Sequence, residues 1–186
     1  MPDLPSIHLR LWRASDAPAL REASESTPDL DTQLGGADLS TIAGALEFIK
    51  TRLRPREGAR HWAIVHAGRA VGNVGLSAIE RRHGTAWVSY WLADSARGNG
   101  LATAAVVAAS AHAFADGIFR LELGHRVNNP ASCRVATRAG FSVEGIERQK
   151  LRYGDQRFDV ELHARLATDP SPDVTPLSLL APPPSI

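Results

Sequence analysis

One segment joins two glycines and an arginine directly to the start of a helix. The run Arg97-Gly98-Asn99-Gly100-Leu101-Ala102 follows an apolar strand pattern and leads into a long stretch of small residues. Glycine lets the backbone turn with its N–H groups facing inward, and a helix start adds unpaired N–H groups and a positive dipole end. Such a turn binds anions and suits a diphosphate. Arg97 adds a charged donor at its rim.

The glycine turn alone also fits a plain strand-to-helix connection. It lacks the Gly-Lys-Ser/Thr ending of a P-loop and the three-glycine spacing of a dinucleotide fold, which argues against a nucleotide-binding protein. Further along, Asn129-Pro130 supplies an N-cap and a first helical residue, with Ser132 in the first turn. As the alternatives, Asn129 is only a helix cap, and the Ser132 side chain only hydrogen-bonds a backbone group.

Periodicity and turn residues predict the elements that hold these segments. The order is strand, two helices, three strands, helix, strand, helix and two strands, which makes an α+β fold. Between Glu22 and Gly36 the polar sequence predicts a mobile loop or a broken helix. The predicted strands are 7–11, 62–66, 70–79, 85–92, 118–123 and a pair around Gly154-Asp155, and the predicted helices begin near Ser15, Ser40, Leu101 and Asn129.

The chain has 186 residues, which suits one domain with a single core. We expect this domain to cover residues 1–168. From Asp169 to Ile186 the sequence is rich in proline and serine, which predicts a disordered tail, 169–186.

Composition excludes several classes of partner. With 21 basic and 20 acidic residues the net charge is +1, so nucleic acid is not the expected partner. No apolar stretch is long enough to span a membrane, and no signal peptide is evident. The single cysteine, Cys133, forms no intrachain disulfide, which fits a reducing, cytoplasmic setting. The preference for arginine over lysine is typical of a GC-rich bacterial genome.

Two blocks in this order resemble the GNAT superfamily of N-acetyltransferases. Arg97-x-x-Gly100-x-Ala102 looks like its acyl-CoA pyrophosphate loop. Asn129-Pro130-Ala131-Ser132, followed by Gly140-Phe141, resembles the RimJ/RimL branch, the ribosomal-protein N-terminal acetyltransferases. The resemblance covers about residues 7–167. It implies the GNAT fold, a mostly antiparallel sheet with a V-shaped splay between its two central strands.

The resemblance also implies roles for individual residues. Leu92 and Ala93 would pair with the pantetheine arm of acetyl-CoA at the splay, and Asn129 would bind near it. Ser132 would lie by the sulfur as the acid, and Glu122 matches a glutamate that related enzymes use as the base, with a surface salt bridge as the alternative. The pyrophosphate would be bound by the amides of Gly98, Asn99, Gly100, Leu101 and Ala102.

One residue departs from the pattern of the family, and no metal ligand set is expected. Many GNAT enzymes carry a tyrosine that protonates the leaving thiolate, on the helix that begins here at Asn129. The residues aligned with it here are Val135 and Ala136, which cannot donate a proton. Ser132 or a water is therefore left as the acid. No metal site is expected, because the seven histidines show no ligand spacing and His61 and His66 lie on opposite faces of one strand. Cys133 is expected to be a small packed residue.

The expected reaction is direct transfer of an acetyl group to a primary amine, most simply a protein or peptide N-terminal α-amine. At pH 7 an α-amine of pKa ~7.8 is roughly 15% neutral, and a lysine of pKa ~10.4 only roughly 0.04%. Six acidic side chains between Glu22 and Glu47, with no Lys or Arg from Glu22 to Ile49, suggest a negative mouth for a cationic amine or simply a solvated surface.

Other functions stay open. One is acetylation or succinylation of a small-molecule amine, such as an antibiotic or polyamine. Another is an acyl-CoA-binding module without activity. The sequence leaves the oligomeric state open, a homodimer included.

Overall fold

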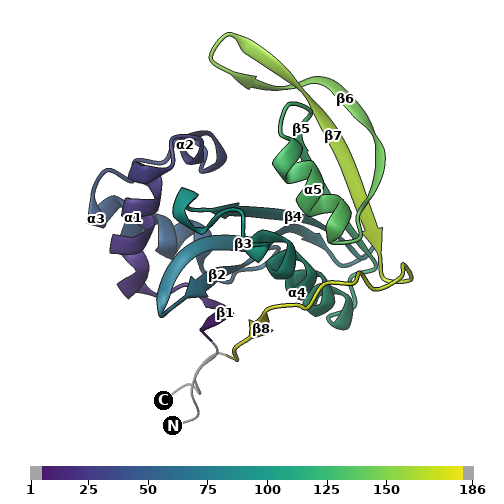
Figure 1. The fold of residues 1–186 in the computed structure, drawn as a ribbon, viewed down its shortest axis with the longest axis horizontal. Helices are drawn as coiled ribbons and strands as arrows, with labels where there is room; N and C mark the ends of the chain where they lie inside the picture. The colour runs from purple at the N-terminus through teal and green to yellow at the C-terminus, as the bar shows by residue number, and fades with distance from the viewer. Residues whose placement is uncertain (1–5, 182–186) are drawn as a thin grey trace.

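A single eight-stranded sheet runs through the computed structural model, which describes residues 6–181 (Figure 1). The strand order is β6-β7-β5-β4-β3-β2-β1-β8, and all neighbours are antiparallel except the pairs β4–β5 and β1–β8. The strands are β1 (Ile7–Leu11), β2 (Arg60–His66), β3 (Arg69–Glu80), β4 (Thr85–Leu92), β5 (Arg120–Arg126), β6 (Ser142–Tyr153), β7 (Gln156–Leu166) and β8 (Ser178–Leu179).

The helices lie on the two faces of this sheet, and the predicted α+β class is confirmed. The predicted broken helix is also confirmed, as α1 and α2 with a short break between them. None of the helices among residues 6–181 has the length and apolar character to cross a membrane. The helices are α1 (Ala17–Ser26), α2 (Leu30–Gln33), α3 (Ile42–Phe48), α4 (Leu101–Ala115) and α5 (Pro130–Arg138), with the short 3-10 helices η1 (Ala14–Asp16) and η3 (Asp94–Ala96) and a π-helical turn η2 (Ile49–Leu53) that continues α3.

The parallel pair of β4 and β5 separates after three rungs. Thr85, Ala86 and Trp87 pair with β5, the last of them with Glu122, and the rest of β4 pairs with no strand on that side within residues 6–181. This is the predicted splay. One side chain lies in the opening, because a Cβ added at Gly124 of β5 would meet the ring of Trp87 at 3.2 Å.

Alternation along β4 directs its side chains into two separate cores. Val88 and Leu92 pack with α4 on one face, whereas Trp91 packs with α1 and α3 on the other. Trp91 is therefore a buried core residue. Tyr90 shares the face of Val88, so its side chain points toward α4 and α5.

A buried ion pair fixes the entry into the first helix. The guanidinium of Arg10 donates two hydrogen bonds, of 2.6 and 2.8 Å, to the carboxylate of Asp16. The same carboxylate accepts a bond from the amide of Arg13. Asp16 directly precedes α1, but its side chain caps the 3-10 turn and bonds to Arg10 of β1 instead of capping α1.

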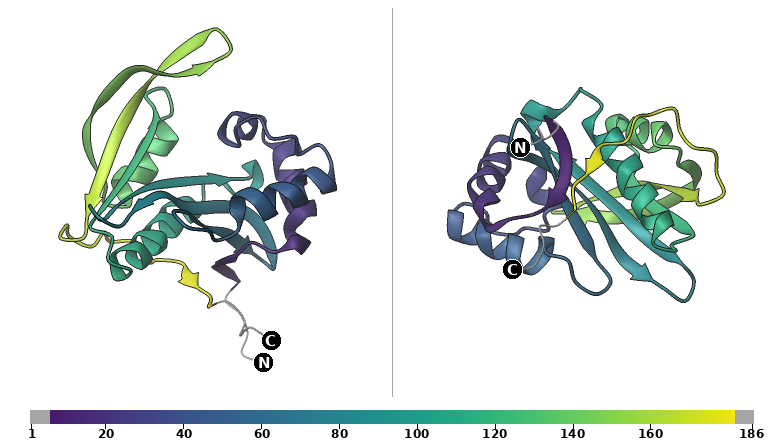
Figure 2. Two further views of the ribbon diagram at one scale, coloured as in Figure 1. Left: turned by 180° about the vertical axis from the view of Figure 1, so that it is seen from behind. Right: turned by 90° about the horizontal axis from the view of Figure 1, so that it is seen from below.

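The predicted disordered tail was wrong for residues 169–181. After β7 the chain crosses back, and β8 pairs in parallel with β1 at the far edge of the sheet (Figure 2). The amide of Leu177 bonds to the carbonyl of Ala104, and the amide of Leu180 bonds to that of Leu9. The segment looked disordered because its apolar residues are few and spaced by prolines. The remaining five residues of the predicted tail lie outside the described residues.

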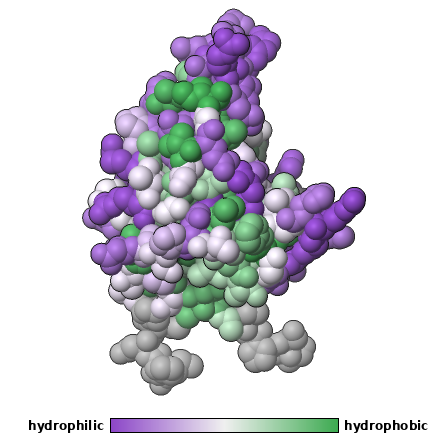
Figure 3. All heavy atoms as spheres, turned by 90° about the vertical axis from the view of Figure 1, so that its right-hand side faces the viewer, coloured by the Kyte–Doolittle hydropathy of each residue, from purple (hydrophilic) through white to green (hydrophobic). Residues whose placement is uncertain are grey.

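The hairpin of β6 and β7 extends beyond the body of the molecule (Figure 1). Figure 3 views the molecule from this side and shows hydrophobic surface below a hydrophilic tip. Among the large apolar side chains that β6 exposes are Val143 and Ile146, each 56% accessible. The hairpin is therefore supported mainly by its own pairing and by β5.

Candidate active site

The glycine turn sits where β4 leads into α4. Gly98 has φ +83° and Gly100 has φ +74°, both in the left-handed region that favours glycine. Gly100 is the N-cap of α4 and offers no side chain to its first turn, and Ala104 is the first residue whose amide bonds back to the Gly100 carbonyl. The amides of 101–103 therefore face outward from the helix start, as an anion site requires.

Two partners hold the side chain of Arg97 in place. Its Nε donates to the carbonyl of Leu92 at 3.1 Å, and one terminal nitrogen bonds to both carboxylate oxygens of Asp29, at 2.9 and 3.0 Å. Thr27 makes a parallel link, since its hydroxyl accepts the amide of Asp94. The segment between α1 and α2 is thus tied to the glycine turn.

A cavity of about 290 Å³ opens beside this turn. It is lined by most of the predicted cofactor residues: Leu92, Arg97, Gly98, Gly100, Leu101, Ala102 and Asn129. Ala93 and Asn99 are not among the described lining residues. The amide of Ala93 is instead bonded to Val71, and the side chain of Asn99 to the carbonyl of Arg97. Sequence reasoning missed Arg134 and Arg138, which lie one turn apart on α5 and face this cavity.

A second, larger cleft of about 850 Å³ lies on the other side of the splay. Its walls come from the segment after α2, from η2, from the splayed parts of β4 and β5, and from the tip of the β6–β7 hairpin. Trp87 lines this cleft, so of the two tryptophans on β4 only Trp91 is buried in a core. The cleft and the smaller cavity share Gln33, Tyr90, Trp91, Asn129 and Ser132.

At this junction a tyrosine meets the predicted serine. The hydroxyl of Tyr90 lies 2.7 Å from the hydroxyl of Ser132 and also donates to its carbonyl at 3.2 Å. Burial raises the pKa of Tyr90 to about 12, although the bond with Ser132 acts in the opposite direction. Asn129 caps α5 by accepting the amide of Ser132 at 3.1 Å, and it lines both cavities as well.

Glu122 is placed differently. Its carboxylate accepts a 2.7 Å bond from Arg120, which also binds Glu144, so it has the surface ion pair considered as its alternative. The cleft is lined by Leu123, Gly124 and other later residues of β5, but Glu122 is not among the described lining residues. The geometry therefore does not bring Glu122 and Ser132 together.

Of the two alternatives for the acidic segment, the negative mouth is not what the structure shows at the cleft. No carboxylate belongs to the described residues that line the cleft, whereas Arg52, Arg56 and Arg126 do. Acidic side chains of this segment are occupied elsewhere, as Glu22 pairs with Arg69 of β3 and Asp29 with Arg97. The acidic segment provides partners for arginines from other elements, and the cleft itself is basic.

The floor of the cleft contains a neutral histidine. Trp12 donates to the side-chain oxygen of Asn73 at 3.0 Å, which turns the amide nitrogen of Asn73 toward Nδ1 of His61, 3.4 Å away. Burial, with a smaller contribution from Arg56, lowers the pKa of His61 to about 4. Its ring lies directly over Gly75, where an added Cβ would come within 2.1 Å of Nδ1.

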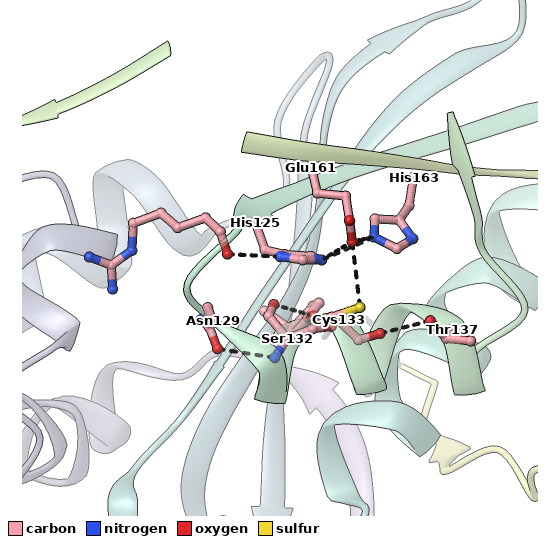
Figure 4. Close-up of polar contacts among 9 residues, drawn as sticks. His125, Asn129, Ser132, Cys133, Thr137, Glu161 and His163 are labelled. Atoms are coloured by element: carbon pink, nitrogen blue, oxygen red, sulfur yellow. Dashed lines mark hydrogen bonds and ion pairs between the residues drawn. The ribbon is translucent and has the colours of Figure 1, made fainter. Parts of the chain in front are cut away.

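Beside the cleft, four potential metal ligands converge, which corrects the expectation that the histidines form no ligand set. Figure 4 shows His125 of β5, Cys133 of α5, and Glu161 and His163 of β7 pointing toward one another. Their ligand atoms all lie within 4.8 Å of one another. Sequence spacing missed this set because it comes from three separate elements.

The comparisons with known proteins fit this geometry. A family model described as the acetyltransferase (GNAT) domain matches residues 6–142, which is most of the chain. The chain belongs to the GNAT acetyltransferase family. The RimJ/RimL resemblance is also confirmed, since a similar solved structure is RimL, a ribosomal L7/L12 α-N-protein acetyltransferase in complex with coenzyme A. It has TM-score 0.79 and 26% identity, covering 89% of this chain and 96% of that one.

Two further relatives place the chain within the family. The ribosomal-protein-serine acetyltransferase of Escherichia coli (strain K12) is 34% identical over 115 residues, 61% of this chain and 64% of that protein. Mycobacterium smegmatis RimJ, solved with a CoA disulfide, has TM-score 0.76 and 26% identity, covering 87% of this chain and 82% of that one. The match to the E. coli protein spans less than two thirds of its length. The predicted GNAT fold is confirmed by these structures.

Proposed function

We propose that this protein transfers an acetyl group from acetyl-CoA to a primary amine. The observation that carries the proposal is the junction of two cavities at Tyr90 and Ser132, one beside an anion-binding turn and one broad and open. A GNAT acyltransferase needs such a junction, because donor and acceptor must meet through the opened sheet. A direct attack fits, since Cys133 is not among the described residues lining either cavity.

The smaller cavity fits coenzyme A. The uncapped first turn of α4 offers amides for a diphosphate, and Arg134 and Arg138 add positive charge on the facing helix. The unpaired edge of β4 after Trp87 offers backbone groups to an extended amide chain. Acetyl-CoA supplies the activated acetyl group as a thioester. RimL and RimJ, the relatives above, were solved with coenzyme A species bound.

Tyr90 and Ser132 are the proposed source of the proton that the leaving sulfur needs. Tyr90 stays neutral because burial raises its pKa to about 12, so its hydroxyl keeps a proton throughout the range of an assay. The 2.7 Å contact lets Ser132 receive a proton from Tyr90 as it gives up its own. This pair replaces the tyrosine that many GNAT enzymes carry on the helix corresponding to α5.

Glu122 remains the proposed base only through water. Direct proton removal requires hydrogen-bond reach, and Glu122 faces Arg120 outside the cleft. If Glu122 relays the amine proton, Glu122→Gln should lower kcat/KM by roughly 10²–10⁴ at neutral pH and recover partly toward pH 9. A loss below tenfold with an unchanged pH profile would make Glu122 a structural partner of Arg120.

The basic cleft suggests an amine that lies next to negative charge. The cleft would repel a polyamine and attract a peptide whose N-terminal residue is followed by acidic ones, because of the positive charge of Arg52, Arg56 and Arg126. An α-amine also suits a site without a strong base near its centre, because a larger fraction of it is neutral at pH 7. The proposed acceptor is therefore a protein N-terminus followed by acidic residues. The E. coli relative is named for acetylating a ribosomal-protein serine.

The test is a matched panel of peptides. Peptides with the same N-terminal serine and either acidic or basic residues after it should differ in kcat/KM, with the acidic series at least tenfold better. Arg52→Glu with Arg56→Glu should reduce or reverse this preference while leaving the Kd for acetyl-CoA unchanged. Equal rates for both series would contradict the acceptor assignment, and release of CoA with a small amine alone would favour the small-molecule alternative.

The same assay distinguishes the proposed enzyme from a module that binds acyl-CoA without catalysis. A module that only binds acyl-CoA would bind acetyl-CoA tightly and release no CoA with any amine in the panel. A cytoplasmic location, expected from the sequence, fits an acceptor exposed on newly made protein.

A further inference from the structure

The four side chains beside the cleft point their ligand atoms at one small volume. Nε2 of His125 lies 3.0 Å from Nε2 of His163 and 3.3 Å from Oε1 of Glu161. The same carboxylate oxygen is 2.9 Å from Nε2 of His163 and 3.5 Å from Sγ of Cys133. Both imidazoles are buried, and the other two side chains are partly buried (Figure 4).

The tautomer of His125 is set by its other nitrogen. Nδ1 lies 3.0 Å from the backbone carbonyl of Arg126, and a carbonyl only accepts, so Nδ1 carries the proton. The lone pair of Nε2 therefore faces His163 and Glu161. A ring N–H bonded to a backbone carbonyl is the usual outer contact of a metal-ligating histidine. Nε2 of His125 and Oε1 of Glu161 thus compete for the one proton on Nε2 of His163, and the only other donor that the described residues bring there is the weak S–H of Cys133, 3.5 Å from Glu161. A shared cation would satisfy both acceptors better.

The spacing agrees with a tetrahedral ion. Zinc bonds of about 2.0–2.3 Å to nitrogen, oxygen and sulfur place neighbouring ligand atoms about 3.3–3.8 Å apart. The four contacts described above range from 2.9 to 3.5 Å, and all the ligand atoms lie within 4.8 Å of one another, so an ion would fit after Glu161 and His163 move outward and Cys133 adjusts toward them. Two imidazoles, a thiolate and a carboxylate form a mixed donor set that zinc binds in this geometry.

We propose that Cys133, His125, His163 and Glu161 bind one zinc-class divalent cation. All four positions would be filled by the protein, which is the pattern of a structural site and not of a catalytic one. The ion would join β5, α5 and β7 beside the splay, next to Ser132 in the chain. It would fix the start of α5, and through it the position of Ser132 against Tyr90.

A missing hydrogen bond at His163 lowers the expected affinity for the ion. If Nε2 of His163 binds the metal, the ring proton must sit on Nδ1. Nδ1 is buried and has no hydrogen-bond partner among the described residues. Loss of such an outer contact costs about 10–100-fold in metal affinity. The site should therefore bind zinc more weakly than a fully supported four-ligand site, and a mild chelator should remove the ion.

Cobalt(II) gives the sharpest test, because Cys133 is the only cysteine. The full-length protein, without an affinity tag and freed of metal under reducing conditions, is titrated with Co²⁺ alone. We expect one Co²⁺ per chain, with the visible bands of tetrahedral cobalt and a thiolate-to-cobalt charge-transfer band that only Cys133 can supply. Zn²⁺ should abolish both signals by displacement, and it should raise the Tm of the metal-free protein.

Two variants complete the test. Cys133→Ser is a conservative change at a partly buried position, and it should remove the charge-transfer band and weaken Zn²⁺ binding at least tenfold while the fold is retained. His83→Ala changes an exposed histidine in the β3–β4 turn and should leave the stoichiometry and both bands as in the unaltered protein. Absence of stoichiometric binding, octahedral spectra, or bands that persist in Cys133→Ser would each overturn the proposal.

Discussion

The hydroxyls of Tyr90 on β4 and Ser132 on α5 lie 2.7 Å apart at the junction of the two cavities. If the two act as one proton source, Tyr90→Phe and Ser132→Ala should each lower kcat by roughly 10–10²-fold. The double variant should lose little more than the worse single one, because residues that act as a unit are not additive. Steady-state kinetics on the three variants checks this.

Tyr153 offers a matched control. It lines the larger cleft, but its ring stacks near Phe158 and it is not among the described residues that line the smaller cavity. Tyr153→Phe should keep kcat within a few-fold of the unaltered enzyme. Fully additive losses in the Tyr90 and Ser132 variants would show that the two hydroxyls act separately.

Gly100 should be required for acetyl-CoA binding. A Cβ at this position meets no protein atom within 4 Å, so Gly100→Val fills only space open to a ligand, at a backbone strain of about 1–2 kcal/mol. We expect the Kd for acetyl-CoA to rise at least tenfold, about 1.4 kcal/mol. Calorimetric titration measures it.

The variant Gly58→Val is the control that separates backbone strain from the loss of acetyl-CoA binding. Gly58 has the same φ of +74°, open space around it and no contact with either cavity. Gly58→Val should lower the Tm about as much as Gly100→Val but leave the Kd for acetyl-CoA unchanged. Equal effects of the two variants on the Kd would mean that the turn contributes only to stability.

His61 should make the protein less stable in acid. Its pKa is about 4 in the folded protein, against an ordinary value of 6.5, so between these two values the unfolded chain binds a proton that the folded chain does not. The free energy of unfolding therefore falls as pH drops from 6.5 to 4, by at most about 3 kcal/mol. Urea unfolding of the unaltered protein and of His61→Gln at several pH values should show a shallower slope for the variant. Parallel slopes would contradict the assignment.

Removal of the last strand should destabilise the protein without affecting the site. Truncation after Asp169 deletes β8 together with Val174, Leu177 and Leu179, which pack against the core. The loss of this apolar contact should cost about 2–4 kcal/mol and lower the Tm by roughly 5–15 °C. Truncation after residue 181 keeps these contacts and is the control, with an unchanged Tm. A stable protein after the longer truncation would show that β8 is dispensable.

The sequence predicted the parts of the site that are local. Glycines at 98 and 100, the cap at Asn129 and the strand before them all depend on neighbours in the chain, so their conformation follows from residue type. The α+β order also follows from local periodicity. The splay could be inferred only through the family resemblance, because no residue pattern in β4 or β5 marks where two parallel strands separate.

Contacts between distant elements could not be predicted. Tyr90 and Ser132 are 42 positions apart, and their contact depends on how α5 packs on the open edge of β4. The predicted strand 118–123 is β5, 120–126, so His125 was placed outside it. In β7 the apolar residues Phe158, Val160 and Leu162 alternate on one face, whereas Glu161 and His163 lie on the other, where Cys133 of α5 contacts Glu161.

The parallel pairing of β8 with β1 also governs how the sheet is completed during synthesis. β1 is made before β8, so the edge of β1 that pairs with β8 stays unpaired while residues 12–177 emerge from the ribosome. An open strand edge is a template for pairing with other chains. Two residues, Ser178 and Leu179, end that exposure, and a nascent chain that stops short of them would present β1 to its neighbours.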